Sequence, residues 1–177
     1  MKKTNILVLA LICLAGTLHA QTPAELKEQF IKDWTRAKEY TSQYLKAMPA
    51  NKYNAKAADS IRTFSEQMLH LASANIFFGS WATAKPGIFS GFNMEKSAGA
   101  QSHDSTVYYV NASYDYVIES LKALDAAKLG ELAPMGKNSF PRYLVLSKGF
   151  EHQTHHRGQC TIYIRSVGVR PPNEMLF

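Results

Sequence analysis

Cysteine is scarce in this chain. The 177 residues include two, Cys13 and Cys160, and the sequence predicts that Cys13 is removed with a leader segment. No intrachain disulfide could then form. An exported protein without a disulfide must rely on its core for stability.

The start of the chain lacks a run long enough to be a comfortable membrane span. Lys2 and Lys3 precede a short apolar run from Ile6 to Leu14, and small residues follow it. This pattern is typical of a secretory signal peptide. We predict that residues 1–20 are the signal peptide, that cleavage follows Ala20, and that residues 21–177 form one periplasmic or secreted domain.

Two alternatives to this leader remain open at the level of sequence. Cys13 could be the lipidated residue of a lipoprotein, although Ile12 stands where a small residue is usual. The apolar start could also stay uncleaved in a cytoplasmic protein. Leu18 is large for its place three residues before the cut, so the exact bond is also open.

A surface suited to nucleic acid is missing as well. The chain carries 20 Lys and Arg against 14 Asp and Glu, for a net charge of +6, of which Lys2 and Lys3 supply part. The basic residues are scattered and acidic residues lie among them. We interpret this as a solvated surface and exclude nucleic acid as a partner.

Strand-like alternation is not convincing anywhere, whereas helical spacing of apolar residues is frequent. Helices are expected from Pro23 to Pro49, Ala57 to Phe78, Ser105 to Leu129 and Pro141 to Val167. Four long helices in one domain predict an all-α four-helix bundle. Gly79–His103 is expected to be a long loop, and loops of this length are often functional.

Three histidines carry the chemistry that the sequence offers. His152 and His156 are four residues apart in the last expected helix, and they share a face with apolar or small residues such as Val145 and Cys160. A third, His70, lies in an earlier apolar helix. Buried imidazoles need partners, and one divalent metal ion would satisfy all three. The alternative is core histidines that bond backbone carbonyls.

Other residues near this pattern are expected to have supporting or structural roles. We expect His155 and His103 to lie outside the ligand set, and Cys160 to be a small core residue. Gln159 returns to the edge of the histidine face and is a candidate to hydrogen-bond a ligand histidine or a water. Glu66 could orient His70. Gly149 removes bulk where another helix could approach.

Two separated segments resemble the DinB-like (YfiT-like) metalloprotein superfamily. One runs from His152 through Gln159 to Pro172, and the other comprises Met48–Tyr53 and Phe64–Ala72. The resemblance implies a bundle of up-down-down-up connectivity. It also implies a metal, usually zinc or nickel with iron or manganese as alternatives, held by one histidine of the second helix and a His-x-x-x-His pair of the fourth. These positions are His70, His152 and His156.

Members of this family with known activity include S-transferases and isomerases that use low-molecular-weight thiols. The resemblance therefore implies a metal-dependent enzyme, transferase-like or hydrolase-like, that acts on a small molecule. The alternative is a noncatalytic metal- or ligand-binding protein. We expect no membrane partner after processing and leave a homodimer open.

No protein nucleophile is evident for such a reaction. Gly-x-Ser-x-Gly is absent from the sequence, and Cys160 lies in an apolar stripe that should blunt its reactivity. A water or thiol at the metal is the expected nucleophile. Trp81, Phe89 and Phe92 are expected to shape access to it.

Overall fold

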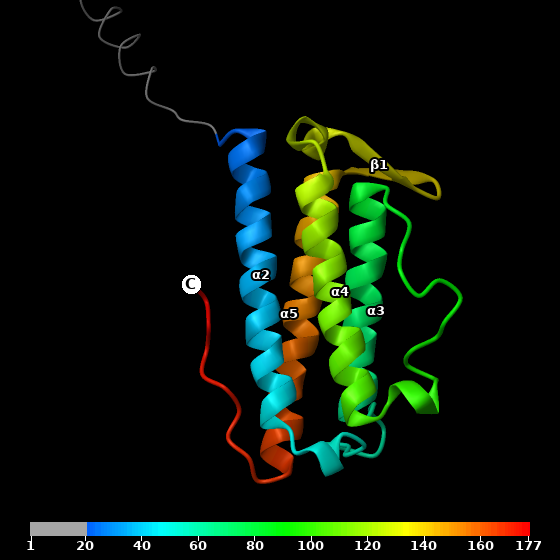
Figure 1. Cartoon of the computed structure of the whole chain (residues 1–177), viewed down its shortest axis with the longest axis vertical. Helices are drawn as coiled ribbons and strands as arrows, with labels where there is room; N and C mark the ends of the chain where they lie inside the picture. Colours follow the sequence, from blue (N-terminus) through cyan, green and yellow to red (C-terminus); the bar gives the residue numbers. More distant parts are fainter. Residues whose placement is uncertain (1–20) are drawn as a thin grey trace, which may run out of the picture.

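A computed structural model describes residues 21–177, which form a bundle of four long helices (Figure 1). The helices are α2 (Pro23–Ala47), α3 (Phe64–Thr83), α4 (His103–Ala123) and α5 (Arg142–Ser166). The expected all-α four-helix bundle is confirmed. The predicted signal peptide, residues 1–20, lies outside the described residues.

The helices follow the up-down-down-up order (Figure 1). α3 and α4 run in the same direction, so the segment 84–102 must travel the length of the bundle to join them. α3 packs against α4 and α5, and α2 packs against the same two helices. The facing pair α3 and α5 carries the three histidines singled out from the sequence.

Two helices begin with reciprocal capping boxes. Thr22 and Glu25 cap α2, and Thr63 and Glu66 cap α3. The Glu66 carboxylate accepts a hydrogen bond of 2.7 Å from the Thr63 backbone amide. Glu66 therefore caps the start of the helix. Of its two possible roles, a helix charge or a partner of His70, the second is wrong, because Glu95 contacts His70 instead.

The second and third helices differ from their expected bounds. α3 begins at Phe64 and continues to Thr83, because Thr63 caps it and the short 3-10 turn η2 (Ala50–Lys52) and further turns precede it. α4 begins at His103, since Ser102 accepts from the Ser105 amide as its N-cap, and ends at Ala123. Two further 3-10 turns, η3 (Ala98–Ala100) and η4 (Ala126–Gly130), flank α4.

A small antiparallel hairpin was not expected from the sequence. Its strands are β1 (Leu132–Met135) and β2 (Asn138–Pro141), with Leu132 opposite Pro141. Each strand spans four residues and is mostly exposed, so burial imposes no clear alternation on the sequence. Gly136 adopts a positive φ of 59° at the turn, which glycine allows without steric cost.

The core fixes the position of α5 in two ways. Around Gly149, α5 approaches α3 closely, because a Cβ added there would lie 2.8 Å from Phe78 Cβ. This confirms the expected role of Gly149. Elsewhere a buried polar network joins α5 to its neighbours. Tyr114 of α4 donates a hydrogen bond of 2.8 Å to Gln153, and Arg157 also donates to Gln153 at 2.8 Å.

The network also reaches Thr41 of α2, whose hydroxyl lies 2.8 Å from the Tyr114 hydroxyl. Gln153 and Arg157 each follow a candidate metal ligand by one residue, so the same contacts that pin them also set the rotation of α5. Within residues 21–177, no helix is long and apolar enough to cross a membrane.

Candidate metal centre

His70 of α3 and the pair His152 and His156 of α5 converge on one point. One ring nitrogen of each lies within 4.8 Å of the others. The ring centroids of His70 and His156 are 4.5 Å apart, and those of His152 and His156 are 4.3 Å apart. The structure thus brings together all three residues predicted as ligands.

The spacing within the α5 pair suits a shared metal ion. His152 Nε2 and His156 Nε2 are 3.1 Å apart. In a tetrahedral zinc site, two nitrogens at bonding distance are about 3.3 Å apart. The pair therefore needs little adjustment to bind one ion, and a set of three imidazoles could hold a divalent metal.

Glu95 orients His70. Its Oε1 lies 2.9 Å from His70 Nδ1, and its Oε2 lies 3.4 Å from the Nε of Arg62. A carboxylate at Nδ1 keeps the proton there and leaves Nε2 as the lone-pair nitrogen, which is how carboxylate–histidine–metal arrangements work. Glu95 comes from the 84–102 segment and was not predicted from the sequence.

Gln67 contacts the Nδ1 atom of His156, as Glu95 contacts that of His70. Its amide nitrogen lies 2.7 Å from His156 Nδ1. If the side-chain amide of Gln67 is flipped, its Oε1 faces His156 Nδ1 instead. The Nδ1–H group then donates to Oε1, and Nε2 is free to bind metal. Gln67 was not predicted from the sequence, although its position one turn before His70 on α3 was a usable signal.

Gln159 acts less directly than expected. It lies close to the Gln67 amide, and its own amide nitrogen is 3.1 Å from His155 Nε2. It therefore supports the residue that contacts His156. His152 differs again, because its buried Nδ1 has no hydrogen-bond partner among residues 21–177. Its ring packs 5.8 Å from that of Phe78.

Burial and mutual repulsion favour the neutral imidazole at His152 and His156. Burial, followed by the neighbouring histidines and Arg62, lowers the pKa of His156 to about 3. Burial and His70 likewise lower the pKa of His152. Neutral imidazole is the form that binds metal, so little proton competition is expected at pH 7.

The remaining candidates lie outside the cluster, as expected. His155 is exposed, and His103 bonds Asp104 at 2.6 Å and packs edge-on against Tyr53. Cys160 is buried, which raises the pKa of its thiol. Phe89 and Phe92 belong to the 84–102 segment, whereas Trp81 lies within α3.

One pocket includes a single histidine of the cluster in its wall. It has a volume of about 650 Å³, and His156 and Gln67 are part of its wall. The rest of the wall includes Arg62, Gln159 and Tyr163. A ligand bound at the histidines could therefore be reached from solvent, which a closed structural site would not allow.

The fold is shared with solved structures of two proteins from Bacillus species. A DinB-like protein from Bacillus cereus is 21% identical, with a TM-score of 0.71 over 84% of this chain and 97% of that chain. A DinB-like protein from Bacillus subtilis is 17% identical, with a TM-score of 0.65 over 84% and 96%. No functionally curated protein is similar enough to match.

The family model agrees over almost the whole length. The model of the DinB family, a metal-binding superfamily, matches residues 20–175. That range contains all four helices and the three converging histidines. The chain belongs to the DinB family.

Proposed function

We propose that this protein is an exported metal-dependent enzyme that acts on a small molecule, with its metal held by His70, His152 and His156. The observation that carries the proposal is the convergence of three ring nitrogens within 4.8 Å beside a pocket of about 650 Å³. Three neutral nitrogen ligands and an accessible fourth side are typical of catalytic sites. Imidazole ligands suit zinc or nickel, and iron is an alternative.

When bound, the divalent ion would supply Lewis acidity and lower the pKa of a coordinated water or thiol. The protein's own part is to hold the ligands. Glu95 keeps the proton on His70 Nδ1, and Gln67 contacts His156 Nδ1. With the Gln67 amide turned so that its oxygen faces Nδ1, both contacts leave the Nε2 lone pair free for a metal ion, so these two ligand rings are oriented before metal binds.

Hydrolase-like chemistry fits the proposed export better than thiol transfer does. Low-molecular-weight thiols are kept reduced in the cytoplasm, whereas the periplasm and cell exterior are oxidising. Water needs no such supply. The buried Cys160 has a raised thiol pKa, so it is a poor nucleophile.

Export rests on the sequence alone, on Lys2, Lys3 and the apolar run that follows. We expect the mature protein to begin at or near Gln21. Intact-mass analysis of protein from the periplasm or medium tests this. Full-length protein found in the cytosol alone would contradict it.

Metal removal tests the enzymatic part of the proposal. The protein would be stripped with a chelator, then reloaded with zinc, nickel, manganese or iron, and metal content, unfolding temperature and turnover would be measured on ester, amide and thiol-plus-electrophile panels. Turnover that disappears on stripping and returns on reloading supports an enzyme. Stripped protein that unfolds, with no turnover in any loaded form, would indicate a structural metal and contradict the proposal.

A further inference from the structure

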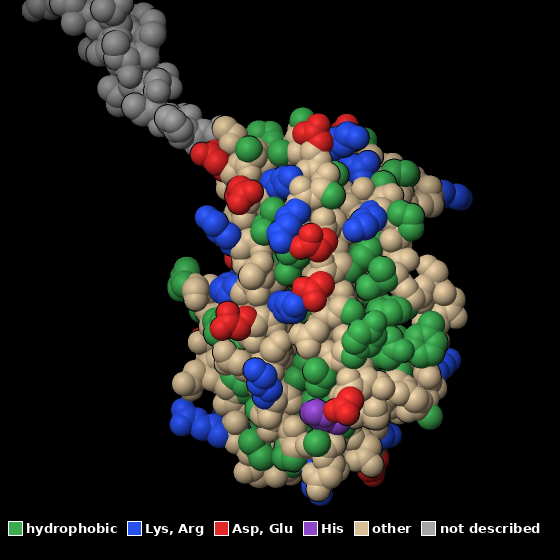
Figure 2. All heavy atoms as spheres, viewed as in Figure 1, with side chains coloured by type: hydrophobic (Ala, Val, Ile, Leu, Met, Phe, Trp, Pro, Cys, Tyr) green, Lys and Arg blue, Asp and Glu red, His purple; other side chains and the backbone are tan. Residues whose placement is uncertain are grey.

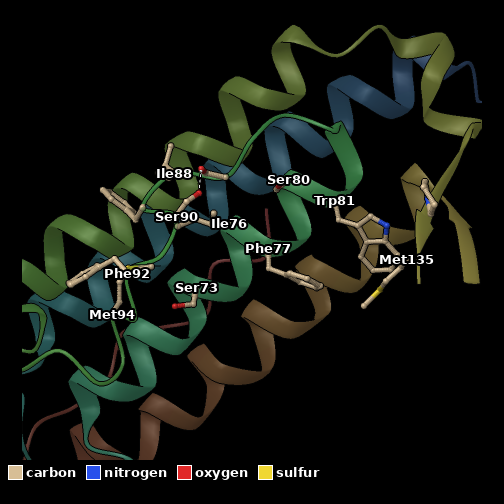
Figure 3. A pocket seen from close by; sticks show the side chains of 13 residues that line it. Ser73, Ile76, Phe77, Ser80, Trp81, Ile88, Ser90, Phe92, Met94 and Met135 are labelled. Carbon is tan, nitrogen blue, oxygen red and sulfur yellow. Dashed lines mark hydrogen bonds between the residues drawn. The ribbon is translucent and has the colours of Figure 1, made fainter. Parts of the chain in front are cut away.

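A separate pocket lies between α3, the segment 84–102 and the hairpin (Figure 3). Its volume is about 510 Å³. Phe77 and Trp81 of α3 and Met135 of β1 line one end, and Phe92 and Met94 of the crossing segment line the other (Figure 3). Phe89, also from that segment, completes the apolar wall.

The wall of this pocket is uncharged. No lysine, arginine, aspartate or glutamate is among the described residues that line it, and its polar side chains are the hydroxyls of Ser73, Ser80 and Ser90. The Ser90 hydroxyl donates to the Gly87 carbonyl at 3.0 Å. A charged ligand group would lose hydration here without gaining a partner, so the pocket suits an uncharged ligand.

Three of the apolar side chains that line this pocket are exposed. Phe77 is 49% exposed, Phe92 40% and Met135 44%. Figure 2 shows hydrophobic side chains gathered on the side of the molecule where α4 and the 84–102 segment lie in Figure 1. Single exposed apolar residues are common, but a cluster that lines a hollow indicates a binding site.

None of the three histidines lines this pocket, but two elements carry residues of both the pocket and the histidine cluster. Ser73 follows His70 by one turn of α3, a rise of about 4.5 Å, and lines the pocket. Met94 also lines it and is the residue before Glu95, which hydrogen-bonds His70. The same helix and the same segment therefore form both the pocket wall and the support of the metal position.

We propose that this pocket binds the uncharged, ring-bearing apolar part of the substrate, whose reacting group lies at the metal. This inference rests on the proposed function and specifies its substrate class. The volume falls within the range of about 300–1,000 Å³ that small-molecule sites occupy, and aromatic walls favour flat rings.

Two dyes that share a scaffold test the inference. N-phenyl-1-naphthylamine is neutral, and 8-anilinonaphthalene-1-sulfonate adds a negative charge. Fluorescence titration of zinc-loaded protein should show one neutral dye bound per chain, and the sulfonate should bind at least about tenfold more weakly because its charge is desolvated without a partner. Equal affinity for both dyes would overturn the inference.

Variants locate the dye. Phe77→Ala and Phe92→Ala should each weaken binding of the neutral dye about tenfold, since each removes a ring from the wall. Tyr143→Ala is the matched control, because Tyr143 is a similarly exposed aromatic residue of α5, at 42%, that does not line this pocket. Unchanged binding in both pocket variants would overturn the assignment.

The link to the metal needs its own measurement. In cobalt-loaded protein, the paramagnetic ion should speed relaxation of the bound dye's protons relative to zinc-loaded protein. A dye that binds without this effect would lie away from the metal and would overturn the substrate role. Sedimentation could instead show a dimer that Phe77→Ala dissociates and that does not bind the dye. This result would also overturn the substrate role of the pocket.

These outcomes are distinguishable from failure of the proposed function. If elemental analysis finds no metal in the folded protein while the dye still responds to Phe77→Ala and Phe92→Ala, the pocket stands as a ligand site and the metal-dependent function fails. If metal binds stoichiometrically and the dye does not bind, the inference about the pocket fails alone.

Discussion

The close approach of α5 to α3 at Gly149 yields a quantitative prediction from two glycines of one helix. Gly149 faces α3, where an added Cβ would lie 2.8 Å from Phe78 Cβ and 3.2 Å from its Cγ. Gly158 lies on the same helix, and an added Cβ there would meet nothing within 4 Å. Both changes to alanine bring the same gain in helix propensity, so their difference isolates the contact.

The expected magnitudes follow from this geometry. Gly158→Ala should stabilise the protein by about 0.5–1 kcal/mol, because alanine restricts the unfolded chain and favours helix. In Gly149→Ala the new contact falls about 0.7 Å short of an ordinary carbon–carbon separation. Rotating the Phe78 side chain cannot relieve it, because Cβ is fixed to the backbone. Overpacking of this kind costs about 1–3 kcal/mol.

The free energy of unfolding of Gly149→Ala should therefore be about 1–3 kcal/mol lower than that of Gly158→Ala. This corresponds to a difference of roughly 3–9 °C in Tm for a chain of this size. Guanidinium denaturation of chelator-treated protein measures the free energy of unfolding. Because Gly149 precedes His152 by less than one turn, and Phe78 packs on His152, zinc affinity should fall as well. Equal stability of the two variants would refute the close-approach argument.

Three further predictions concern the metal site and the thiol. His156→Ala should abolish stoichiometric metal binding in elemental analysis, whereas His155→Ala, an exposed neighbour, should retain it; unchanged content in His156→Ala would refute the ligand assignment. Glu95→Gln should weaken zinc affinity about 10–100-fold in a chelator competition, with exposed Glu119→Gln as a control that should have no effect. Cys160→Ser should keep most activity, and native protein should react with a thiol reagent at pH 8 only after denaturant is added, because burial raises the pKa of this thiol; rapid labelling of the native protein would contradict this.

Periodic features of the sequence were sufficient to predict the bundle and the shared face of His152 and His156, whereas the family resemblance placed His70 with them. His152 and His156 lie one turn apart on an inward face, and this relation depends only on helix geometry. Helix ends were less predictable. Ala57 to Phe78 looked like one helix, but Thr63 and Glu66 form a capping box that starts α3 at Phe64. The box was present in the sequence as Thr-x-x-Glu and was not used.

The partners of the histidines were harder to predict because they depend on tertiary contacts. Gln67 could have been found from its place one turn before His70. Glu95 is separated from His70 by 25 residues and lies in a glycine-containing segment without periodicity, so no local rule selects it over Glu66. The hairpin β1–β2 was missed for a similar reason, since its short exposed strands leave no burial pattern.

The position of Glu95 follows from the topology. α3 has 20 residues and is therefore about 30 Å long, and α4 runs parallel to it (Figure 1). An extended chain needs about 9 residues to return over that distance, whereas the segment 84–102 has roughly twice as many. The additional residues allow the segment to lie along α3 rather than cross it directly. In doing so it places Glu95 at His70 and supplies Phe89, Phe92 and Met94 to the apolar pocket. A shortened segment that still joined α3 to α4 should therefore preserve the bundle but weaken both metal and dye binding, and equal binding of both would show that the additional length has no role at the site.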